Sequence, residues 1–503
     1  INVGNRRQLL FDDFFIGRGS PEREDSPHLI RWGFGKLEKS PLLMQGDRPW
    51  ERHVAWVSVV KDGGLYRAWY HNHNPGGDPA EGVRIGYAES QNGLDWRKPD
   101  LNILEVHGSK KNNLVYSGPR DAWSIEMGNV FIDPVAKAGE RFKMIHSSRE
   151  GRHVWPLGDY PYVPEAGVLK GAYSPDGLNW TTYPAMFLGR IPDTQAVAAY
   201  DPTIGKYVAY VRHHASYGKL DIGENRVRQA GRGGGIGRME SWSYANGWSF
   251  PEPVLMPDFD DSLNVDLYNP GYMRYPGAEN AHFMFPSVID RWEGTLKVKA
   301  AVSRDGRAWV RPNRDDVLSL GSVGRFDSAR IYFGPNFVQL SRDEYAIYYR
   351  GINDPHGGCH PSVKPANPRL EGMGRAVFKR DRILGIEAGP REGVFSTRAL
   401  LFDGRRLVIN AEPIGPDPRI QVQLIGVGLN EVRRSKLPVS REDAVVEGCS
   451  FADSIPITSD VLDGEVRWRT KDSIAEWAGK PVRLHFRVKN MRIYSFQFLE
   501  VIG

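Results

Sequence analysis

The chain has 503 residues, about three times a typical domain length, which excludes a single small hydrophobic core. Its 66 Lys and Arg residues against 61 Asp and Glu residues give a net charge of +5, which is too dilute for a nucleic-acid-binding chain, and no long basic run concentrates it. Hydrophobic residues make up 40% of the chain, yet no stretch approaches the roughly 20 apolar residues of a membrane span, so we expect a soluble globular protein.

The opening segment, QLLFDDFFI at 8–16, predicts a strand that completes the last sheet or clamps two domains together. For Asp12 and Asp13 a strand-end hydrogen bond is favoured over catalysis. The first residues hold neither an initiating Met nor a hydrophobic signal core, which is typical of a processed N-terminus. We therefore expect a secreted or periplasmic protein whose signal peptide has been removed.

A short phrase then recurs along the chain: SQNGLDW at 90–96, SPDGLNW at 174–180 and SRDGRAW at 303–309, with a looser copy, SYANGW, at 243–248. Asn-Gly and Asp-Gly supply the positive φ angles of a two-residue hairpin turn, and the Trp can fold back over the hairpin as a hydrophobic plug. Each phrase predicts an outer hairpin.

Three β-rich runs recur in a fixed order, five times in all. The first-strand runs are 54–60, 128–133, 194–200, 270–275 and 332–338; the second-strand runs are 66–70, 141–145, 207–211, 282–285 and 345–349; the third-strand runs are 85–89, 169–173, 237–241, 297–301 and 374–378. One such unit cannot bury both faces of its sheet, whereas units stacked radially can. The sequence therefore predicts an all-β fold with a five-bladed β-propeller over residues 1–392. A β-sandwich with coincidental turns is the alternative.

From residue 393 onward the recurrent phrase is absent and the β-rich runs no longer follow the same order. At least six further strands, with turn signals such as Asp403-Gly404 and Asp463-Gly464, fill about 110 residues. We expect a β-sandwich domain over 393–503. The only cysteines, Cys359 and Cys449, are too few for a zinc knuckle, and a disulfide between them stays open, as does the oligomeric state.

One end of a propeller's axial channel collects the starts of the first strands and the loops that follow the second strands. An acid stands at each first strand: Glu51, Glu126, Asp193, Asp266 and Asp327. The predicted binding residues around them are His71, His73, Arg212, His213, Tyr268, Arg350 and His356. For any single acid, capping a turn is the alternative.

Carboxylates accept hydrogen bonds from sugar hydroxyls and arginine donates in a fork, so this set favours a carbohydrate ligand. Two carboxyls can divide the work of glycosidic cleavage, and their separation, which the sequence does not give, decides retention or inversion. Adjacent His213 and His214 face opposite sides of a strand, which disfavours a shared metal ion. No cofactor and no metal ligand set is predicted, although a calcium ion in the channel stays open. The glycine run 231–237 predicts a flexible loop or β-turn at the pocket rim.

Several phrases resemble the bacterial proteins known as glycoside hydrolase family 32-like, which are furanosidase-like five-bladed propellers with a C-terminal β-sandwich. They include IGYAES at 85–90, KNN at 111–113, FIDP at 131–134, DTQ at 193–195, DLYN at 266–269 and FDS at 326–328. The resemblance spans nearly the whole chain. It implies a base or nucleophile from blade one, an auxiliary acid from blade two and a proton donor from blade three, at Glu51, Glu126 and Asp193.

The chain lacks the Asn-Asp-Pro-Asn, Arg-Asp-Pro and Glu-Cys phrases of fructan hydrolases, so Asp266 or Asp327 can replace Glu51 or Glu126. The sequence thus predicts an exo-acting glycoside hydrolase of a poly- or oligosaccharide, with Asp193 as proton donor and Glu51 or Asp266 as nucleophile or base. A non-catalytic carbohydrate-binding propeller and a glycoside phosphorylase are the alternatives. The net charge of +5 favours an acidic or sulfated sugar as the ligand.

Overall fold

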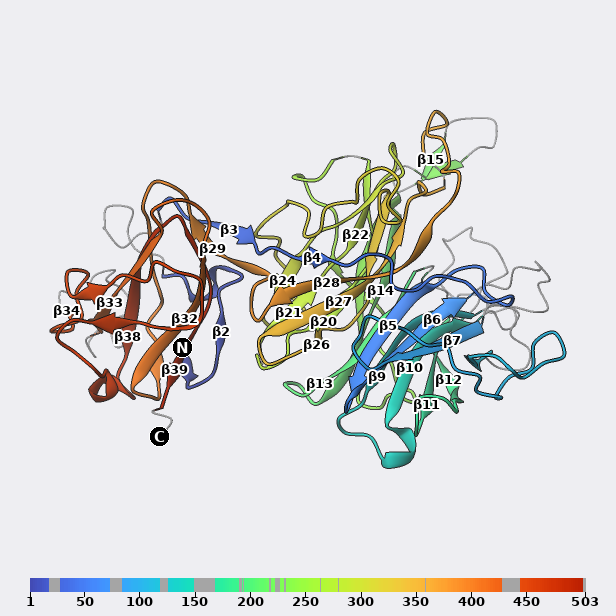
Figure 1. Cartoon of the computed structure of the whole chain (residues 1–503), viewed down its shortest axis with the longest axis horizontal. Helices are drawn as coiled ribbons and strands as arrows, with labels where there is room; N and C mark the ends of the chain where they lie inside the picture. The colour runs from blue at the N-terminus through green and yellow to red at the C-terminus, as the bar shows by residue number, and fades with distance from the viewer. Residues whose placement is uncertain are drawn as a thin grey trace.

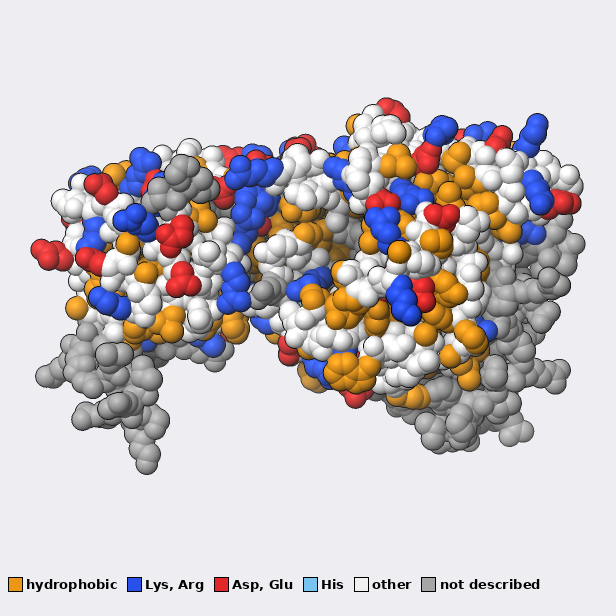
Figure 2. All heavy atoms as spheres, turned by 90° about the horizontal axis from the view of Figure 1, so that it is seen from below, with side chains coloured by type: hydrophobic (Ala, Val, Ile, Leu, Met, Phe, Trp, Pro, Cys, Tyr) orange, Lys and Arg blue, Asp and Glu red, His pale blue; other side chains and the backbone are white. Residues whose placement is uncertain are grey.

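The computed structural model describes residues 1–17, 28–72, 84–117, 125–148, 168–189, 192, 194–216, 219–221, 227–229, 232–262, 264–278, 280–357, 359–427 and 444–500. Within these ranges the protein is all-β, with three-residue 3-10 turns and no α-helix. A larger lobe holds most of the strands and a smaller lobe holds both termini (Figure 1). A waist separates the lobes, and acidic and basic side chains are interspersed on the face shown in Figure 2.

The larger lobe begins with three separate four-stranded antiparallel sheets, each with its strands in chain order. The first sheet is β5 (Ala55–Asp62), β6 (Leu65–Asn72), β7 (Arg84–Ser90) and β8 (Leu114–Tyr116); the second is β9 (Ile125–Ile132), β10 (Phe142–Ser148), β11 (Val168–Ser174) and β12 (Thr181–Leu188); the third is β13 (Val197–Asp201), β14 (Lys206–Ser216), β17 (Arg232–Ser241) and β18 (Glu252–Leu255). The small strands β15 (Lys219–Asp221) and β16 (Val227–Gln229) pair with each other. These strands overlap the runs predicted from β-branched and aromatic residues, which suit a half-buried pleated surface.

Two further strand groups follow. Eight of their eleven strands share one sheet, and the other three form a separate three-stranded sheet. The fourth group has broken strands, β19 (Val265–Asn269), β20 (Tyr272–Arg274), β21 (His282–Met284), β22 (Ser287–Asp290), β23 (Leu296–Val298) and β24 (Ala301–Ser303); the fifth has β25 (Arg330–Phe333), β26 (Val338–Gln339), β27 (Glu344–Ile352), β28 (Glu371–Lys379) and β4 (Glu38–Lys39). A parallel pairing of Leu296 with Arg330 joins them. Because these groups share a sheet, the count of five blades stays a prediction.

The strand groups close into a ring. Hydrophobic clusters lie between consecutive groups; for example, Trp69 packs on Phe142 with ring centroids 5.8 Å apart. Tyr70 of the first group and Tyr348 of the last group belong to one cluster, which joins the end of the ring to its start. The first strands also meet at their inner edges, where Ser58 donates to the carbonyl of Val130 at 3.0 Å. The first strands therefore surround a common axis.

The recurrent phrases form the tight turns that their sequences predict. In the copy that starts at Ser174, the Ser174 hydroxyl accepts from the backbone N–H of Gly177 at 2.8 Å, and the Asp176 carboxylate accepts from the N–H of Asn179 at 2.8 Å. Gly177 has a φ of 76°, which a side chain would strain. The copies at Ser90 and Ser303 repeat these serine and Asx bonds.

Three of these turns are held by an aromatic residue of the preceding strand group, and we call these bonds the aromatic latches. Trp69 Nε1 donates to the Gly177 carbonyl at 2.7 Å, Tyr210 Oη to the Gly306 carbonyl at 2.7 Å, and Tyr348 Oη to the Gly93 carbonyl at 2.8 Å. The third latch runs from the last group to the first. The turns therefore serve the contacts between sheets as well as their own hairpins.

The N-terminal segment 8–16 contacts both lobes, whereas the strand that completes the last sheet comes from later residues. β2 (Gln8–Leu9) pairs with β39 (Met491–Leu499) of the smaller lobe, and Arg304 of the larger lobe binds the Asp12 carboxylate at 2.6–3.1 Å. The segment 8–16 is thus a clamp between the lobes, and Asp12 has the structural role that was favoured. The strand that completes the last sheet is β4, which pairs with β28.

The smaller lobe has two sheets around one hydrophobic core. One sheet runs β3 (Arg31–Phe34), β29 (Leu384–Ala388), β39, β32 (Arg406–Pro413), β36 (Val461–Glu465), and the other runs β30 (Gly393–Ser396), β38 (Val482–Lys489), β33 (Arg419–Gly426), β34 (Ala444–Val445). Two short pairs complete the lobe: β1 (Asn2–Gly4) with β31 (Leu401–Phe402), and β35 (Ser454–Ile455) with β37 (Arg467–Trp468). The predicted class, an all-β propeller followed by a β-sandwich, is confirmed. The boundary at 392/393 stays a prediction; β29 already pairs within this lobe.

Both cysteines are free thiols, so the open disulfide is not formed. In the residues that the structure describes, no helical segment is long and apolar enough to cross a membrane.

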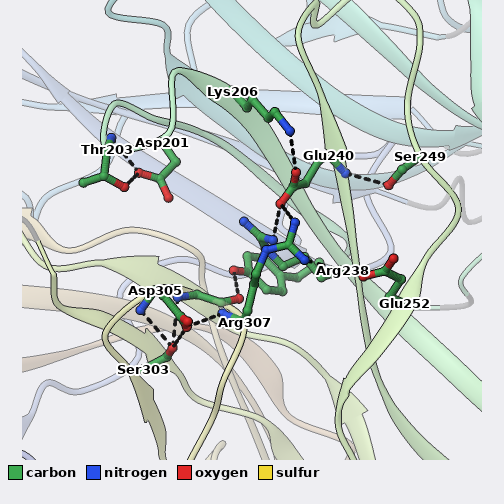
Figure 3. A network of polar contacts seen from close by, with 12 residues as sticks. Asp201, Thr203, Lys206, Arg238, Glu240, Ser249, Glu252, Ser303, Asp305 and Arg307 are labelled. Atoms are coloured by element: carbon green, nitrogen blue, oxygen red, sulfur yellow. Dashed lines mark hydrogen bonds and ion pairs between the residues drawn. The ribbon is translucent and has the colours of Figure 1, made fainter. Parts of the chain in front are cut away.

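A partly buried ion network joins the third and fourth strand groups at the outer side of the ring. Glu240 of β17 accepts from Lys206 at 3.0 Å, from Arg238 and from Arg307 of the third full turn phrase (Figure 3). Burial favours a raised pKa for Glu240, but the hydrogen bond from Lys206 and the two guanidinium charges outweigh it and lower the pKa below its ordinary 4.5.

We expect Glu240→Gln to lower the free energy of unfolding at pH 7 by about 1–3 kcal/mol, because the charged acceptor of three cationic donors is lost. A carboxyl whose folded pKa is depressed stabilises the fold above its unfolded pKa, and this contribution disappears as the pH falls through the folded value. The difference between variant and wild type should therefore shrink below about pH 4.5 in urea titrations. Glu252→Gln, at a carboxylate whose side chain is 72% exposed, is the matched control and should change stability little. An equal loss in both variants contradicts the prediction.

Candidate functional site

Side chains from four of the strand groups meet around the ring axis and form one connected set, which we call the axial cluster. Its members are His53, Trp56, Arg212, Asp266, Tyr268, Arg291, Arg330, Tyr332, Arg350, Asp354, His356, Arg369 and Glu371, linked by ion pairs and ring contacts. They come from the first, third, fourth and fifth groups. Only the space around the axis is common to these groups, as expected for a propeller site.

Asp266 lies at the centre of one half of the cluster. Its Oδ2 atom accepts from Arg212 of β14 at 3.0 Å and from Arg291, which follows β22, at 2.5 Å. The side chain is 1% exposed. Its other oxygen, Oδ1, is buried and has no hydrogen-bond partner among the described residues. An ion pair with two arginines requires the charged carboxylate, so Asp266 offers a base, a nucleophile or a hydroxyl acceptor, and no proton.

The glycine run at 231–237 explains how Asp266 fits. The prediction of a flexible loop or turn there is wrong: residues from Arg232 onward form β17, a central strand of the third sheet. A Cβ atom at Gly234 would lie 1.7 Å from Asp266 Oδ1, and one at Gly235 would lie 2.0 Å from Met256 Sδ. The glycines let other chain segments approach the strand backbone closely, which is a recognised role of glycine within strands.

Aromatic rings form a wall beside the charged groups. The Arg212 guanidinium lies 4.5 Å from the centroid of the Tyr268 ring. The ring centroids of Tyr268 and Tyr332 are 6.2 Å apart, and those of Trp56 and Tyr332 are 5.3 Å apart in an edge-on arrangement. Trp56 has a φ of 46°, in a register shift between Ala55 and Ser58 of β5. A bulky residue at positive φ is strained, and such bulges re-aim side chains next to functional sites. The half-buried indole suits stacking against the apolar face of a sugar ring.

A second carboxylate, Glu371 at the start of β28, organises the other half of the cluster. It pairs with Arg350 at 3.0 Å, with Arg369 at 2.9 Å and with His53 Nδ1 at 3.1 Å. Burial would raise its pKa, but the His53 hydrogen bond and the Arg350 charge hold the pKa of Glu371 well below its ordinary value. Burial lowers the pKa of His53, with Glu371 opposing the shift. Glu371 is therefore ionised at neutral pH and does not serve as an acid.

His356 lies beside Tyr268 in the Asp266 half of the cluster. Its ring contacts Tyr268 at 5.1 Å, and its Nδ1 lies 2.8 Å from the carbonyl of Gly357. Burial lowers its pKa, and the positive charges of Arg330, Arg291 and Arg212 lower it further. The imidazole is therefore neutral at pH 7. The axial cluster holds five arginines against three carboxylates, an excess of two positive charges among the described residues.

The structure thus brings together five of the predicted site residues: Asp266, Arg212, Tyr268, Arg350 and His356. Two other predicted acids have separate partners. Glu51 accepts from Tyr70 and pairs with Lys98 at 2.5 Å, and Asp327 binds Lys39 at 2.6 Å and Tyr349 Oη at 3.0 Å. Tyr349 precedes Arg350 on β27 and so faces the opposite side of the sheet from the cluster.

The remaining predicted residues are placed as follows. Asp193 and His73 lie outside the described residues, and Glu126 lies on β9 in a stretch whose side chains are not described. His71 is buried on β6 opposite Ala55, and His213 follows Arg212 on β14. Their roles stay predictions. In the described ranges no group of three His, Cys, Asp or Glu side chains is placed to hold a metal ion.

Sequence reasoning missed His53, Trp56, Arg330, Tyr332, Asp354, Arg369 and Glu371, and it did not commit to Arg291. A weak signal existed for two of them, since His53 precedes the first strand by two residues and Arg291 follows the second strand of its group. Glu371 stands on a third strand, where no acid was expected. Its partner His53 is more than 300 residues away, so no local pattern marks it.

A large cavity lies elsewhere, near the ends of the first strands. It has a volume of about 920 Å³ and is lined by residues of both lobes, among them Arg6, Asn129, Tyr200, Tyr275 and Asn336. Asn129 and Asn336 use their amides to bond neighbouring backbone carbonyls. The charged groups of the axial cluster do not line it, so it is not the candidate site.

No protein-family model matches the chain, and no curated protein matches it. Among solved structures, one described as a glycoside hydrolase is similar, with a TM-score of 0.45 and 14% identity over 69% of this chain and 92% of that chain. An N-acetylgalactosamine deacetylase from F. plautii has a TM-score of 0.44 and 12% identity, covering 70% and 96%. The catalytic domain of a family 62 α-L-arabinofuranosidase from Coprinopsis cinerea has a TM-score of 0.42 and 10% identity, covering 69% and 98%. Likenesses this distant leave the function to be argued from the site.

Proposed function

We propose that the protein is a carbohydrate-active enzyme, a glycoside hydrolase that binds its sugar in the axial cluster. The observation that carries the proposal is Asp266, a buried carboxylate with one oxygen held by two arginines and the other without a partner among the described residues. Tyr268 and the strained Trp56 belong to the aromatic wall of the same cluster, and half-buried rings suit an apolar sugar surface.

In this proposal Asp266 is the nucleophile or base of glycosidic cleavage. Its charge is fixed by Arg212 and Arg291, so the two arginines hold the carboxylate in one orientation for attack on the anomeric carbon or for deprotonation of water. Glu371 is ionised and engaged by two arginines and by the His53 imidazole, which suits it to position Arg350 and His53. The proton donor must then be another group, and Asp193 keeps that proposed role.

The proposed exo-acting mode and secretion belong to the same hypothesis. An exo-acting enzyme releases only short products from chain ends, whereas an endo-acting enzyme shortens the polymer at once. The product profile over time distinguishes the two modes, and it also separates a hydrolase from a carbohydrate-binding protein, which releases nothing.

The test is a screen of aryl glycosides and of plant and marine oligosaccharides, with reducing sugar as the readout, for the wild type and for Asp193→Asn. We expect the variant to lose about 10²–10⁴-fold in turnover at an unchanged melting temperature, because a positioned proton donor contributes that much. Unchanged turnover removes Asp193 from the mechanism. Binding without product across the screen contradicts the hydrolase and favours the lectin alternative.

A glycoside phosphorylase is the second candidate, favoured by the two excess positive charges of the axial cluster, which would also seat phosphate. Turnover that requires added inorganic phosphate and yields a sugar 1-phosphate would establish it in place of the hydrolase.

A further inference from the structure

The arginines of the axial cluster are not all neutralised. Arg212 and Arg291 share Asp266, while Arg350 and Arg369 share Glu371. The carboxylate that pairs with Arg330 is that of Asp354. Its Oδ2 atom lies 3.8 Å from Arg330 Nη2, and the same oxygen lies 3.6 Å from Arg369 Nη1. Among the described residues, Arg330 therefore has only a long ion pair that it shares with Arg369.

Arg330 is nevertheless held in a defined place. It is 8% exposed, and its Nε donates to the carbonyl of Asp354 at 2.6 Å, which fixes the guanidinium plane. No described carboxylate takes both of its terminal nitrogens. Arg350, which lies close enough for its charge and that of Arg330 to repel, has a buried Nε without a hydrogen-bond partner among the described residues.

Burying guanidinium groups with too few counter-charges is costly unless an anion completes them. Arginine forks match planar carboxylate and tetrahedral sulfate groups through paired hydrogen bonds. The same arginines stand beside the aromatic wall, since Arg350 lies 5.8 Å from both the Trp56 and Tyr332 rings. An anionic group that docks here is therefore next to a surface suited to a sugar ring.

We propose that the substrate carries an anion on the sugar, the carboxylate of a uronic acid or a sulfate ester, and that Arg330 and Arg350 bind it. This inference rests on the proposed function, because it assigns the substrate class of the same site. Free inorganic phosphate is also an anion that arginines bind. The experiment therefore distinguishes an anionic group on the sugar from free phosphate.

The experiment measures dissociation constants of the full chain for matched oligosaccharides by calorimetry. The pairs are oligogalacturonates against the same oligomers with methyl-esterified carboxyls, and sulfated galactan oligosaccharides against their desulfated counterparts. We expect one anionic member to bind at least about tenfold more tightly than its neutral partner. Arg330→Gln should reduce that ratio to near one, and Arg330→Lys, which keeps the charge without the fork, should give an intermediate ratio. Arg467→Gln, at a 68% exposed arginine of the smaller lobe, should leave the ratio unchanged.

The outcomes separate this inference from the proposed function. Tight binding of an anionic oligosaccharide without product supports the inference and contradicts the hydrolase. Hydrolysis of a neutral oligosaccharide as fast as its anionic partner supports the hydrolase and overturns the inference. Equal binding within every pair overturns the inference, as does the absence of binding. Turnover of neutral sugars that depends on inorganic phosphate also overturns it, because the arginines then serve a free anion.

Discussion

Replacing Asp266 by Asn is expected to reduce turnover by about 10²–10⁴-fold, because the amide keeps the shape of the side chain but can neither attack nor take a proton. The same change removes the counter-charge that Arg291 shares with Arg212 and leaves the Arg212 guanidinium buried without it, so the variant should also lose about 3–5 kcal/mol of stability. Turnover measured well below the melting temperature of the variant isolates the first effect.

The matched control for this variant is Asp381→Asn. Asp381 is as buried as Asp266, with a side chain 1% exposed, and pairs with Arg7 at 3.4 Å far from the axial cluster, where Ser495 donates to it at 2.7 Å. We expect this control to lose stability and keep turnover. If both variants lose turnover to the same extent, the effect comes from the fold and Asp266 has no special part in the reaction.

The second large effect is expected for Gly234→Ala. The added methyl group would stand 1.7 Å from Asp266 Oδ1 and 2.6 Å from its Cγ, so the carboxylate must move. Displacing a reacting group by about 1 Å costs on the order of 100-fold in rate, and the overpacking should cost about 1–3 kcal/mol of stability. The expected result is therefore a variant that folds and has lost most of its turnover.

Gly64→Ala serves as its control, because nothing lies within 4 Å of the position of a Cβ atom at Gly64. It should match the wild type in both rate and melting temperature. Should Gly234→Ala retain full activity, the close approach of β17 to Asp266 is not needed for the reaction, and the placement of the site would have to be revised.

Much of the fold could be predicted because its signals are local. The turn phrases carry their own serine and Asx hydrogen bonds, and the alternation along 482–488 marks a strand with one buried face. The glycine run failed for the opposite reason. Its composition is typical of a loop, but its structure is decided by Asp266 and Met256, which arrive from later parts of the chain.

The same distinction separates the correct from the missing site residues. Asp266 and Asp327 have similar local settings, since each is an acid near the start of a first strand. However, Lys39 of β4 binds Asp327, whereas arginines bind Asp266. Glu371 gains its importance only when the ring closes and places His53 beside it. Partners that meet through ring closure leave no trace in sequence spacing.

The aromatic latches bear on how the molecule can be built or shortened. Trp69, Tyr210 and Tyr348 each donate a hydrogen bond to a glycine carbonyl of the next group. Deleting the sheet that carries one of these donors therefore removes both that hydrogen bond and the packing contacts from the neighbouring group. The turn at 90–96 is made early during synthesis. Its Gly93 carbonyl receives the hydrogen bond from Tyr348 only after some 250 further residues have emerged from the ribosome. Truncated chains should therefore be targets for proteolysis at residues 90–96, whereas the complete chain protects them.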